Sequence, residues 1–462
     1  MKLIYDVGDK PAPRQTLAFA CQQVLAIMAA TIAVPAQVGN GLTASAALFG
    51  AGMGTLVYQL FTKFKSPVFL GSSFAFIPAM AAAFAGAATM ALGYTGLILG
   101  AIAAGLVYVI LSIVVKTAGT GWINKLMPPV VIGPTVACIG LQLAGSVSSG
   151  IKTGDVINAE GFMACNPNLA LVCALVTLFV VVICSTYGKK MVRLIPFIIG
   201  ILAGYAVALA MTLIGNAAGI DALQIIDLTP FKNLVADGFS INTLISIPQF
   251  TFIRGIQGLR DMTGGYLVSV LVAYAPVAFV VFAEHIADHK NLSSIIEKDL
   301  LKDPGLNRTL LGDGVGSIVG TLFGGCPNTT YGESIGTVAI TKNASVISIT
   351  VAAFLCILAS FFSPIVAFLD SIPTCVMQGV CLTLYGFIAV SGLKMLQPVD
   401  LGDNVNLFTV SAILIPGIGG FSVTFGQLTI TNIVGALILG SLVRLVLSKK
   451  KEHDDGPQQV IK

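Results

Sequence analysis

Charged residues divide the 462-residue chain into long apolar stretches. A helix that crosses a bilayer needs about 20 apolar residues, and a stretch of about twice that length holds two helices. Nine stretches contain no Asp, Glu, Lys or Arg: 15–62, 66–115, 126–151, 161–188, 194–220, 262–283, 343–369, 371–393 and 404–443. The pattern predicts an all-α polytopic protein, embedded in a lipid bilayer, with about fourteen transmembrane segments.

These segments are expected to form two sets of seven. The helices are predicted at 15–36, 43–62, 67–86, 94–116, 126–146, 168–187, 194–215, 265–288, 309–325, 328–342, 344–368, 372–391, 404–418 and 425–447. The polar segment 216–264, a predicted extracellular loop with short amphipathic pieces, separates a first repeat, 1–215, from a second, 265–448, and 449–462 is a tail. Because each repeat has an odd number of spans, the two repeats must be inverted, and such transporters place their site at mid-membrane.

The third span of each predicted repeat is unusual. Residues 71–78 read GSSFAFIP and residues 324–341 read GGCPNTTYGESIGTVAIT, so both spans are short and broken by Gly, Pro and small polar residues. Matching interrupted segments in two repeats are the best sequence indication of a transport site. The alternative is that both are ordinary glycine-rich packing faces. Spans 3 and 10 are therefore predicted to be broken or extended.

Composition and charge agree with a membrane location. Only 10% of residues are charged and the mean hydropathy is +0.92, whereas soluble domains have about 25% charged residues. With both termini on one side, 21 of the 25 Lys and Arg residues fall on that side, so the positive-inside rule predicts that both termini are cytoplasmic, at the inner (plasma) membrane. No basic stripe with interleaved aromatic residues indicates nucleic-acid binding. No motif of a metalloenzyme or hydrolase occurs, and no cofactor is expected.

The few acidic residues at membrane depth are the main candidates for chemistry. Glu284 and Asp288 lie four positions apart at the end of the eighth span, which places both carboxyls on one helix face. Two such groups in a medium of low dielectric constant repel each other, and one is expected to hold a proton near neutral pH. The pair is therefore a candidate proton-coupling site. The alternative for Asp288 is a position at the helix end that faces water.

Glu333 lies in the broken tenth span, next to Gly332. A broken helix leaves backbone N–H groups free at the start of its second half, and these suit carbonyl oxygens of a ligand. A carboxylate beside them suits N–H groups, so the two together describe a flat ligand that offers both. Phe74 could stack on such a ring, and Tyr331 and Tyr385 could add polar edges. For each aromatic residue, helix or lipid packing is the alternative.

Other polar residues in or near the spans are predicted to have structural roles. His285 is one position off the acidic face and is expected to pack inside the protein. His289 opens a predicted inner loop at 289–308 and is expected to be solvated, and Asp313 and Asp370 are expected at the membrane interface.

The residues of three segments resemble one transporter family. Residues 283–317 (AEHIADHKNLSSIIEKDLLKDPGLNRTLLGDGVGS), 324–342 and the GSSFAF run at 71–76 are similar to the nucleobase–ascorbate transporters, most of all to the bacterial uracil permeases. The resemblance implies import of uracil. Because uracil is neutral, a co-transported cation is needed, and the Glu284–Asp288 pair suggests a proton. The resemblance further implies a substrate-holding core of spans 1–4 and 8–11, a gate of spans 5–7 and 12–14, and a homodimer formed through the gate.

The resemblance also implies roles for single residues. Glu284 and Glu333 would contact the base, and the backbone at Phe74, with its neighbour Ser73, and at Gly332 would donate to the base's carbonyls. Tyr331 would line the site and Tyr385 would approach it from the gate.

The chain departs from the family pattern at Ser334, where Asn is usual, at Gln22–Gln23, where many members have Gln-His, and at Asp288, where some uracil permeases have His. The last difference leaves the details of proton coupling open. Sodium is the alternative coupling ion, because a carboxylate pair and opened backbone carbonyls could provide the oxygens that it needs. A purine permease of the same fold and an inorganic-anion transporter are the alternative functions.

Overall fold

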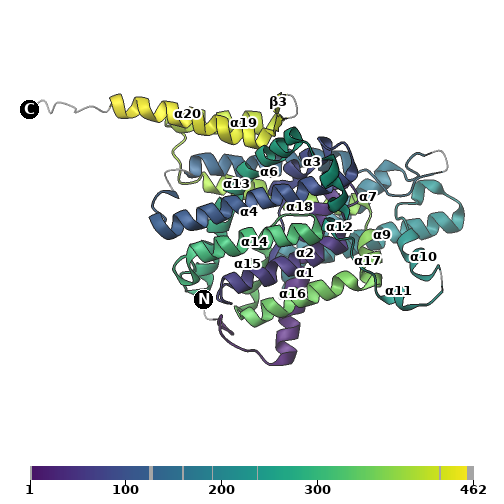
Figure 1. Ribbon diagram of the computed structural model, residues 1–462. Coiled ribbons are helices and arrows are strands. Elements are labelled where there is room, and N and C mark those ends of the chain that lie inside the picture. Colours follow the sequence, from purple (N-terminus) through teal and green to yellow (C-terminus); the bar gives the residue numbers. More distant parts are fainter. Residues whose placement is uncertain are drawn as a thin grey trace, which may run out of the picture.

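Long helices dominate the computed structural model, which describes residues 3–123, 128–158, 161–189, 191–236, 238–425 and 428–454 (Figure 1). A helix satisfies its own backbone hydrogen bonds, as lipid requires. Within these described ranges, eight helices are long and apolar enough to cross a membrane: α1 (Pro13–Val38), α2 (Ala44–Phe61), α4 (Met90–Ala118), α6 (Pro129–Gly150), α7 (Pro167–Tyr187), α9 (Pro196–Ala218), α13 (Gly264–Ile296) and α18 (Thr374–Met395). The predicted all-helical, multi-pass architecture is confirmed.

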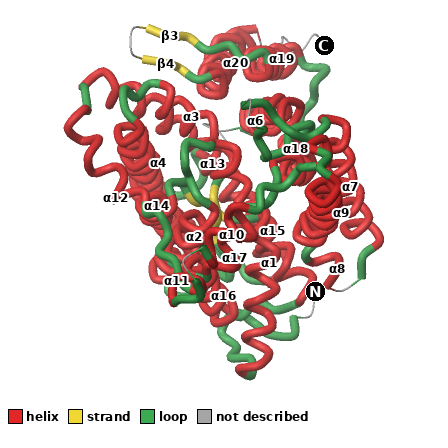
Figure 2. Tube along the Cα trace, turned by 90° about the vertical axis from the view of Figure 1, so that its right-hand side faces the viewer, coloured by secondary structure: helices red, strands yellow, loops and turns green. Residues whose placement is uncertain are grey.

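Further helices complete the bundle. They are α3 (Ile77–Ala85), α8 (Met191–Leu194), α14 (Leu306–Gly324), α15 (Gly332–Thr341), α16 (Val346–Phe361), α17 (Ser363–Asp370), α19 (Asn404–Ile418) and α20 (Asn432–Asp454). The helix expected at 344–368 is interrupted at Phe362, which has extended backbone angles. The helix expected at 425–447 begins later, because a hairpin of β3 (Val423–Phe425) and β4 (Leu428–Ile430) precedes α20 (Figure 2). Residues 455–462 of the predicted tail lie outside the described residues.

Two short strands cross in the interior, where the sequence predicts interrupted spans. β1 (Leu70–Ser72) leads into the 3₁₀ turn η1 (Phe74–Phe76) and α3, and β2 (Asn328–Thr330) leads into α15. The strands pair antiparallel, with Gly71 opposite Thr329, and the pairing continues as Ser73 N–H donates to the Pro327 carbonyl at 2.8 Å. The two glycine-rich segments around 70–76 and 328–332 are therefore extended and broken, where the sequence predicts interruptions.

Helix α13 is longer than the sequence suggests. It is capped by the Thr263 side chain and continues to Ile296, where Glu297 adopts a left-handed conformation and ends it. The expected inner loop at 289–308 is therefore wrong over its first half. Two extra turns of helix follow Asp288, and their buried residues, His289, Leu292 and Ile296, lie three or four positions apart on one helix face.

The segment 216–264 consists of short pieces: η2 (Asp221–Leu223), α10 (Thr229–Val235), α11 (Ile241–Leu244), α12 (Thr251–Gly255) and η3 (Ile256–Asp261). This segment contacts the C-terminal end of α16, where Ser246 N–H donates to the Phe361 carbonyl at 2.9 Å. The N-terminal segment of the chain contacts the N-terminal end of α16, where Val346 N–H donates to the Val7 carbonyl at 3.2 Å. A helix of 16 residues is about 24 Å long. The two segments therefore lie at opposite ends of the bundle, as Figure 1 also shows.

Close helix contacts hold the strand crossing in place. Helix α14 packs against α2 and α4, and α18 packs against α6 and α7. At the α2–α14 contact, a Cβ at Gly54 would lie 2.8 Å from the Gly316 carbonyl oxygen, so only glycine allows this approach. Small residues let helices approach closely in membranes, where packing drives their association. The α2–α14 contact supports the short strands from one side.

Candidate functional site

A cavity of about 380 Å³ lies where the two strands cross. This volume is within the range of about 300–1,000 Å³ that is typical of small-molecule sites. Its walls come from the β1–η1 and β2–α15 junctions, from α13, and from apolar residues of α6, α9 and α18. The lining residues are Ser73, Phe74, Ala75, Val136, Ile139, Phe197, Val280, Glu284, Ala287, Asp288, Thr329, Thr330, Tyr331, Gly332, Glu333, Leu384, Phe387, Ile388, Ser391 and Met395.

Two helix N-termini open onto this cavity, since η1 begins at Phe74 and α15 begins at Gly332. The first N–H groups of a helix have no partner within it and carry partial positive charge. Tyr331 fixes the junction, because its hydroxyl donates to the Ser72 carbonyl at 2.7 Å. A Cβ at Gly71 would collide with the Tyr331 ring, so glycine is required where the strands cross.

Three carboxyl groups face the same cavity. Glu284 and Asp288 project from one face of α13, as their spacing predicts, and Glu333 projects from the first turn of α15. Thr330 of β2 donates its hydroxyl to Asp288 Oδ2 at 2.7 Å. The alternative that places Asp288 at a water-facing helix end is wrong, because α13 continues to Ile296. In the part of the chain that the structure describes, no group of three or more His, Cys, Asp and Glu residues could hold a metal ion.

Two buried hydroxyl groups of the cavity wall are available to a ligand. Ser73 and Thr329 both line the cavity, with exposures of 1% and 2%. Neither hydroxyl has a hydrogen-bond partner among the described residues. Buried polar groups are nearly always hydrogen-bonded in proteins. These hydroxyls therefore favour a polar ligand over an apolar one.

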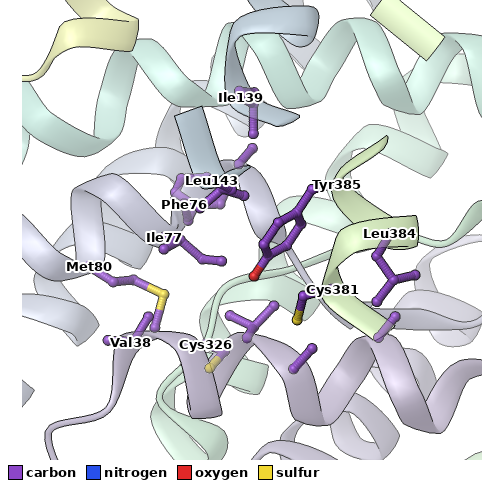
Figure 3. Close-up of a cluster of buried hydrophobic side chains, with 14 of the residues drawn as sticks. Val38, Phe76, Ile77, Met80, Ile139, Leu143, Cys326, Cys381, Leu384 and Tyr385 are labelled. Atoms are coloured by element: carbon purple, nitrogen blue, oxygen red, sulfur yellow. The ribbon is translucent and has the colours of Figure 1, made fainter. Parts of the chain in front are cut away.

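Tyr385 of α18 lies just behind the cavity wall and does not line it. Its ring meets Phe74 edge to face, with centroids 5.7 Å apart and an interplanar angle of 78°. Figure 3 shows it among buried apolar side chains, including Ile139 and Cys381. Its hydroxyl donates to Gln37 Oε1 of α1 at 3.2 Å. Of the eight predicted site residues, the structure brings seven to the cavity and places Tyr385 in contact with one of them.

The unusual Ser334 joins three elements beside the site. Its hydroxyl oxygen accepts from Gln23 Nε2 of α1 at 2.5 Å and from the backbone N–H of Phe69, before β1, at 3.0 Å. Ser334 and Gln23 are almost fully buried. The serine thus ties the start of α15 to α1 and to the opposite strand.

Of three polar residues near the site, His285 agrees with expectation, whereas His289 and Asp313 differ from it. His285 packs inside the protein as predicted, with an exposure of 0%. His289 was expected to be solvated, but its exposure is also 0% because α2 covers it. Asp313 was expected at the interface, yet it is 1% exposed and lies 2.7 Å from His285 Nδ1. Sequence reasoning missed this contact because the two residues are on different helices.

The fold and the cavity together define a class of protein. A cavity within a helix bundle, with polar groups between two broken segments whose helix N-termini point into it, is the arrangement of secondary transporters. The chain is accordingly a multi-pass membrane transporter.

Comparison with known proteins identifies the family. A model described as a permease family matches residues 14–426. A uracil permease of Bacillus subtilis (strain 168) is 35% identical over 457 residues, which cover 98% of this chain and 97% of that protein. A uracil permease of Bacillus caldolyticus is 38% identical over 450 residues, covering 96% and 95%. The chain belongs to this family, the xanthine and uracil permeases, and is a nucleobase permease rather than an enzyme.

One solved structure supports the fold. The transmembrane domain of a cyanobacterium bicarbonate transporter, BicA, superimposes with a TM-score of 0.58 at 14% identity, covering 95% of this chain and 99% of that chain. At this identity the likeness concerns the fold alone.

Proposed function

We propose that this protein imports uracil together with a proton. The observation that carries the proposal is the chemistry of the cavity, where two helix N-termini and three carboxyl groups converge. Uracil is a flat ring with two carbonyl oxygens and two N–H groups. Its oxygens can accept from the helix N-termini, and its N–H groups can donate to the carboxylates. The names of the related uracil permeases agree with this ligand.

In the proposed complex the base lies between the two strand–helix junctions. The N–H groups at Phe74 and Gly332 donate to its carbonyl oxygens, and the carboxylates of Glu333 and Glu284 accept from its ring N–H groups. The Phe74 ring packs on the base. The unpaired hydroxyls of Ser73 and Thr329 complete the polar contacts.

An inorganic anion fits this cavity poorly. No Lys or Arg occurs among the described residues that line it, whereas Glu284, Asp288 and Glu333 do. Helix N-termini attract an anion, but three carboxyl groups at close range repel it. A purine is the remaining alternative, because it carries the same kinds of donors and acceptors on a larger ring system.

A proton is the proposed coupling ion. Uracil is neutral, so the membrane voltage alone cannot concentrate it, and Glu284 with Asp288 offers a site that shares a proton. One charge that crosses about 100 mV supplies about 2.3 kcal/mol, and one pH unit adds about 1.4 kcal/mol. Together these permit accumulation of several hundredfold. Sodium, held by carboxylates and free backbone carbonyls, is the alternative.

The proposed architecture is fourteen segments in two inverted repeats of seven, 1–215 and 265–448, with a substrate-holding core and a gate. Helix packing supports this division, since α14 packs on α2 and α4 of the core, whereas α18 packs on α6 and α7 of the gate. A homodimer formed through the gate is part of the proposal. Cross-linking between cysteines on gate helices in native membranes tests it, and a strictly monomeric protein contradicts it.

Both termini are proposed to be cytoplasmic in the plasma membrane, with 216–264 outside. Two observations support this orientation: the excess of Lys and Arg on one side, and the position of the N-terminal segment and 216–264 at opposite ends of α16. A cysteine introduced at Asn233 should react with an impermeant thiol reagent from outside. Labelling only after membrane disruption would contradict the orientation.

Uptake of labelled uracil into proteoliposomes tests the function. An inward proton gradient without sodium should drive accumulation, and its collapse should abolish accumulation. Unlabelled uracil should compete, whereas xanthine and bicarbonate should not. Competition by xanthine at equal concentration would favour the purine alternative, and accumulation that requires sodium would identify the other coupling ion.

A further inference from the structure

A buried cluster of polar side chains lies behind the cavity face of α13. His285 and His289 each follow a cavity carboxylate by one position, and both are 0% exposed. Their rings stack with centroids 4.1 Å apart and an interplanar angle of 29°. Neither residue lines the cavity. One residue of an α-helix corresponds to about 100° of rotation, so the histidines point to α14 and α2 while the acids face the ligand site.

The hydrogen bonds of His285 determine where its protons are. Its Nε2 lies 3.0 Å from Thr309 Oγ1, and the Thr309 hydroxyl donates to the Leu306 carbonyl at 3.0 Å. A hydroxyl has one hydrogen, so Thr309 must accept from Nε2, which therefore carries a proton. The contact of 2.7 Å between His285 Nδ1 and Asp313 Oδ2 then needs exactly one more proton, located on either atom.

The environment requires that this proton stays with the pair. Asp313 is 1% exposed, and an isolated carboxylate at that depth costs far more than a hydrogen-bonded or neutralised one. His285 is its ion-pair partner among the described residues. With one shared proton the pair has no net charge, whether it is imidazolium with carboxylate or imidazole with carboxylic acid. Gain or loss of a proton would leave a net charge in the interior.

Other ionisable groups pack around the His285–Asp313 pair. Tyr108 of α4 lies edge-on to His285, with centroids 6.3 Å apart. Tyr58 of α2 contacts His289 Nε2 at 2.7 Å, and His289 Nδ1 lies 2.8 Å from the His285 carbonyl oxygen, to which it donates. Glu284 and Asp288 are close enough to interact electrostatically with Asp313. A charged pair would thus act directly on the cavity carboxylates.

We propose that His285 and Asp313 are a positioning pair, separate from the transported proton, whose hydrogen bond locks the rotation of α13 so that Glu284 and Asp288 face the cavity. The pair links α13 to α14, and the His289–Tyr58 contact links it to α2. Because the pair has no net charge, it holds Glu284 and Asp288 in place without adding a charge that would change their protonation. The inference rests on the proposed transport function only where uracil binding and uptake are measured. The labelling measurement does not depend on that function.

Two substitutions of Asp313 separate positioning from proton transport. In Asp313→Asn the amide donates to Nδ1 of a neutral imidazole, and Nε2 still donates to Thr309, so both hydrogen bonds remain without a shared proton. Uracil affinity and the pH dependence of uptake should equal those of the wild type. In Asp313→Leu the Nδ1 atom of His285 loses its partner, and uracil affinity should fall by about tenfold or more, which corresponds to about 1.4 kcal/mol.

A rotation readout makes the test independent of the ligand. Ala287 lies on α13 and lines the cavity, so a cysteine placed there reports its exposure by the rate of labelling with a small water-soluble thiol reagent. The background is the same protein without the introduced cysteine. Labelling should be unchanged with Asp313→Asn and clearly slower with Asp313→Leu. If Asp313→Leu does not fold, the double change His285→Phe with Asp313→Leu removes both polar groups and should fold, but label slowly.

Three results would overturn the proposal. Loss of pH-driven accumulation in Asp313→Asn, with exchange retained, would assign the transported proton to the pair. Wild-type affinity in a folded Asp313→Leu protein would remove the positioning role, and so would wild-type labelling at position 287 in the double variant. If the wild-type protein does not bind uracil while the variants with the cysteine at position 287 show the expected labelling pattern, the proposed substrate is contradicted and the pair's role is intact.

Discussion

Glu333 offers the sharpest test of how the base would be held. It is the second residue of α15, and its carboxylate lines the cavity opposite α13. Its backbone carbonyl accepts from the Thr337 hydroxyl at 2.9 Å, a contact that does not involve the Glu333 side chain. Glu333→Gln keeps the shape and removes one acceptor oxygen, which is replaced by an NH₂ donor.

The expected magnitude follows from this exchange. In the proposed complex the carboxylate accepts from a ring N–H of the base, and the amide can place a donor against that donor. A buried polar group that loses its partner costs about 1–3 kcal/mol, and 1.4 kcal/mol corresponds to a tenfold change in affinity. The dissociation constant for uracil should therefore rise by about 5- to 150-fold. The Gln side chain can also turn its oxygen towards the N–H group of the base, and this orientation gives the lower limit of the expected rise in the dissociation constant.

Isothermal titration of uracil into the purified protein measures this change directly. Glu297→Gln is the matched control, because Glu297 ends α13 outside the cavity and the chemical change is the same. The control should bind as the wild type does, and both variants should elute as folded protein. If Glu333→Gln binds uracil with unchanged affinity, the carboxylate does not contact the base and the proposed geometry is wrong.

Three further outcomes are expected. Asp288→Asn keeps an acceptor for its threonine partner, so it should bind uracil and exchange it but lose pH-driven accumulation; normal accumulation would remove Asp288 from coupling. Ser334→Ala leaves Gln23 and a backbone N–H without their acceptor, so the melting temperature in detergent should fall, with about 1–3 kcal/mol lost per group. The hydrogen bond from Lys298 lowers the pKa of Asp6 below 3.8, so this N-terminal contact should persist at neutral pH and be lost only as the pH falls below that value, as proteolysis at the N-terminus would report.

Much of the fold could be predicted because the membrane imposes simple rules. Stretches without charge correspond to helices, and α19 has the predicted bounds, 404–418. The broken spans were visible because Gly, Pro and small polar residues cluster there, which an uninterrupted apolar helix does not require. Seven of the eight predicted site residues reach the cavity for the same reason, since ionisable or broken positions at membrane depth are costly without a function.

What sequence reasoning missed depends on contacts between distant helices. His289 looked solvated because charged residues follow it, but Tyr58 of α2 provides a buried partner 2.7 Å away. Asp313 looked interfacial because its partner, His285, is 28 positions away. Gln37 was not singled out, although a glutamine in an apolar span needs a partner, and it finds one in Tyr385. The free-energy cost of burying an unpaired amide was the signal that could have identified Gln37.

The likeness to a bicarbonate transporter concerns the fold alone, so the choice of ligand must be sought in the side chains of this protein. The strand–helix junctions of this chain supply two helix N-termini at the cavity, whose partial positive charge suits either an anion or the carbonyl oxygens of a neutral ring. Glu284, Asp288 and Glu333 bring three carboxyl groups to the same cavity, where carboxylates repel an anion. In the proposed complex, Glu284 and Glu333 accept from ring N–H groups of the base. Under this proposal, selection between the two classes of ligand depends on side chains of α13 and α15, because function depends on the residues that a fold positions.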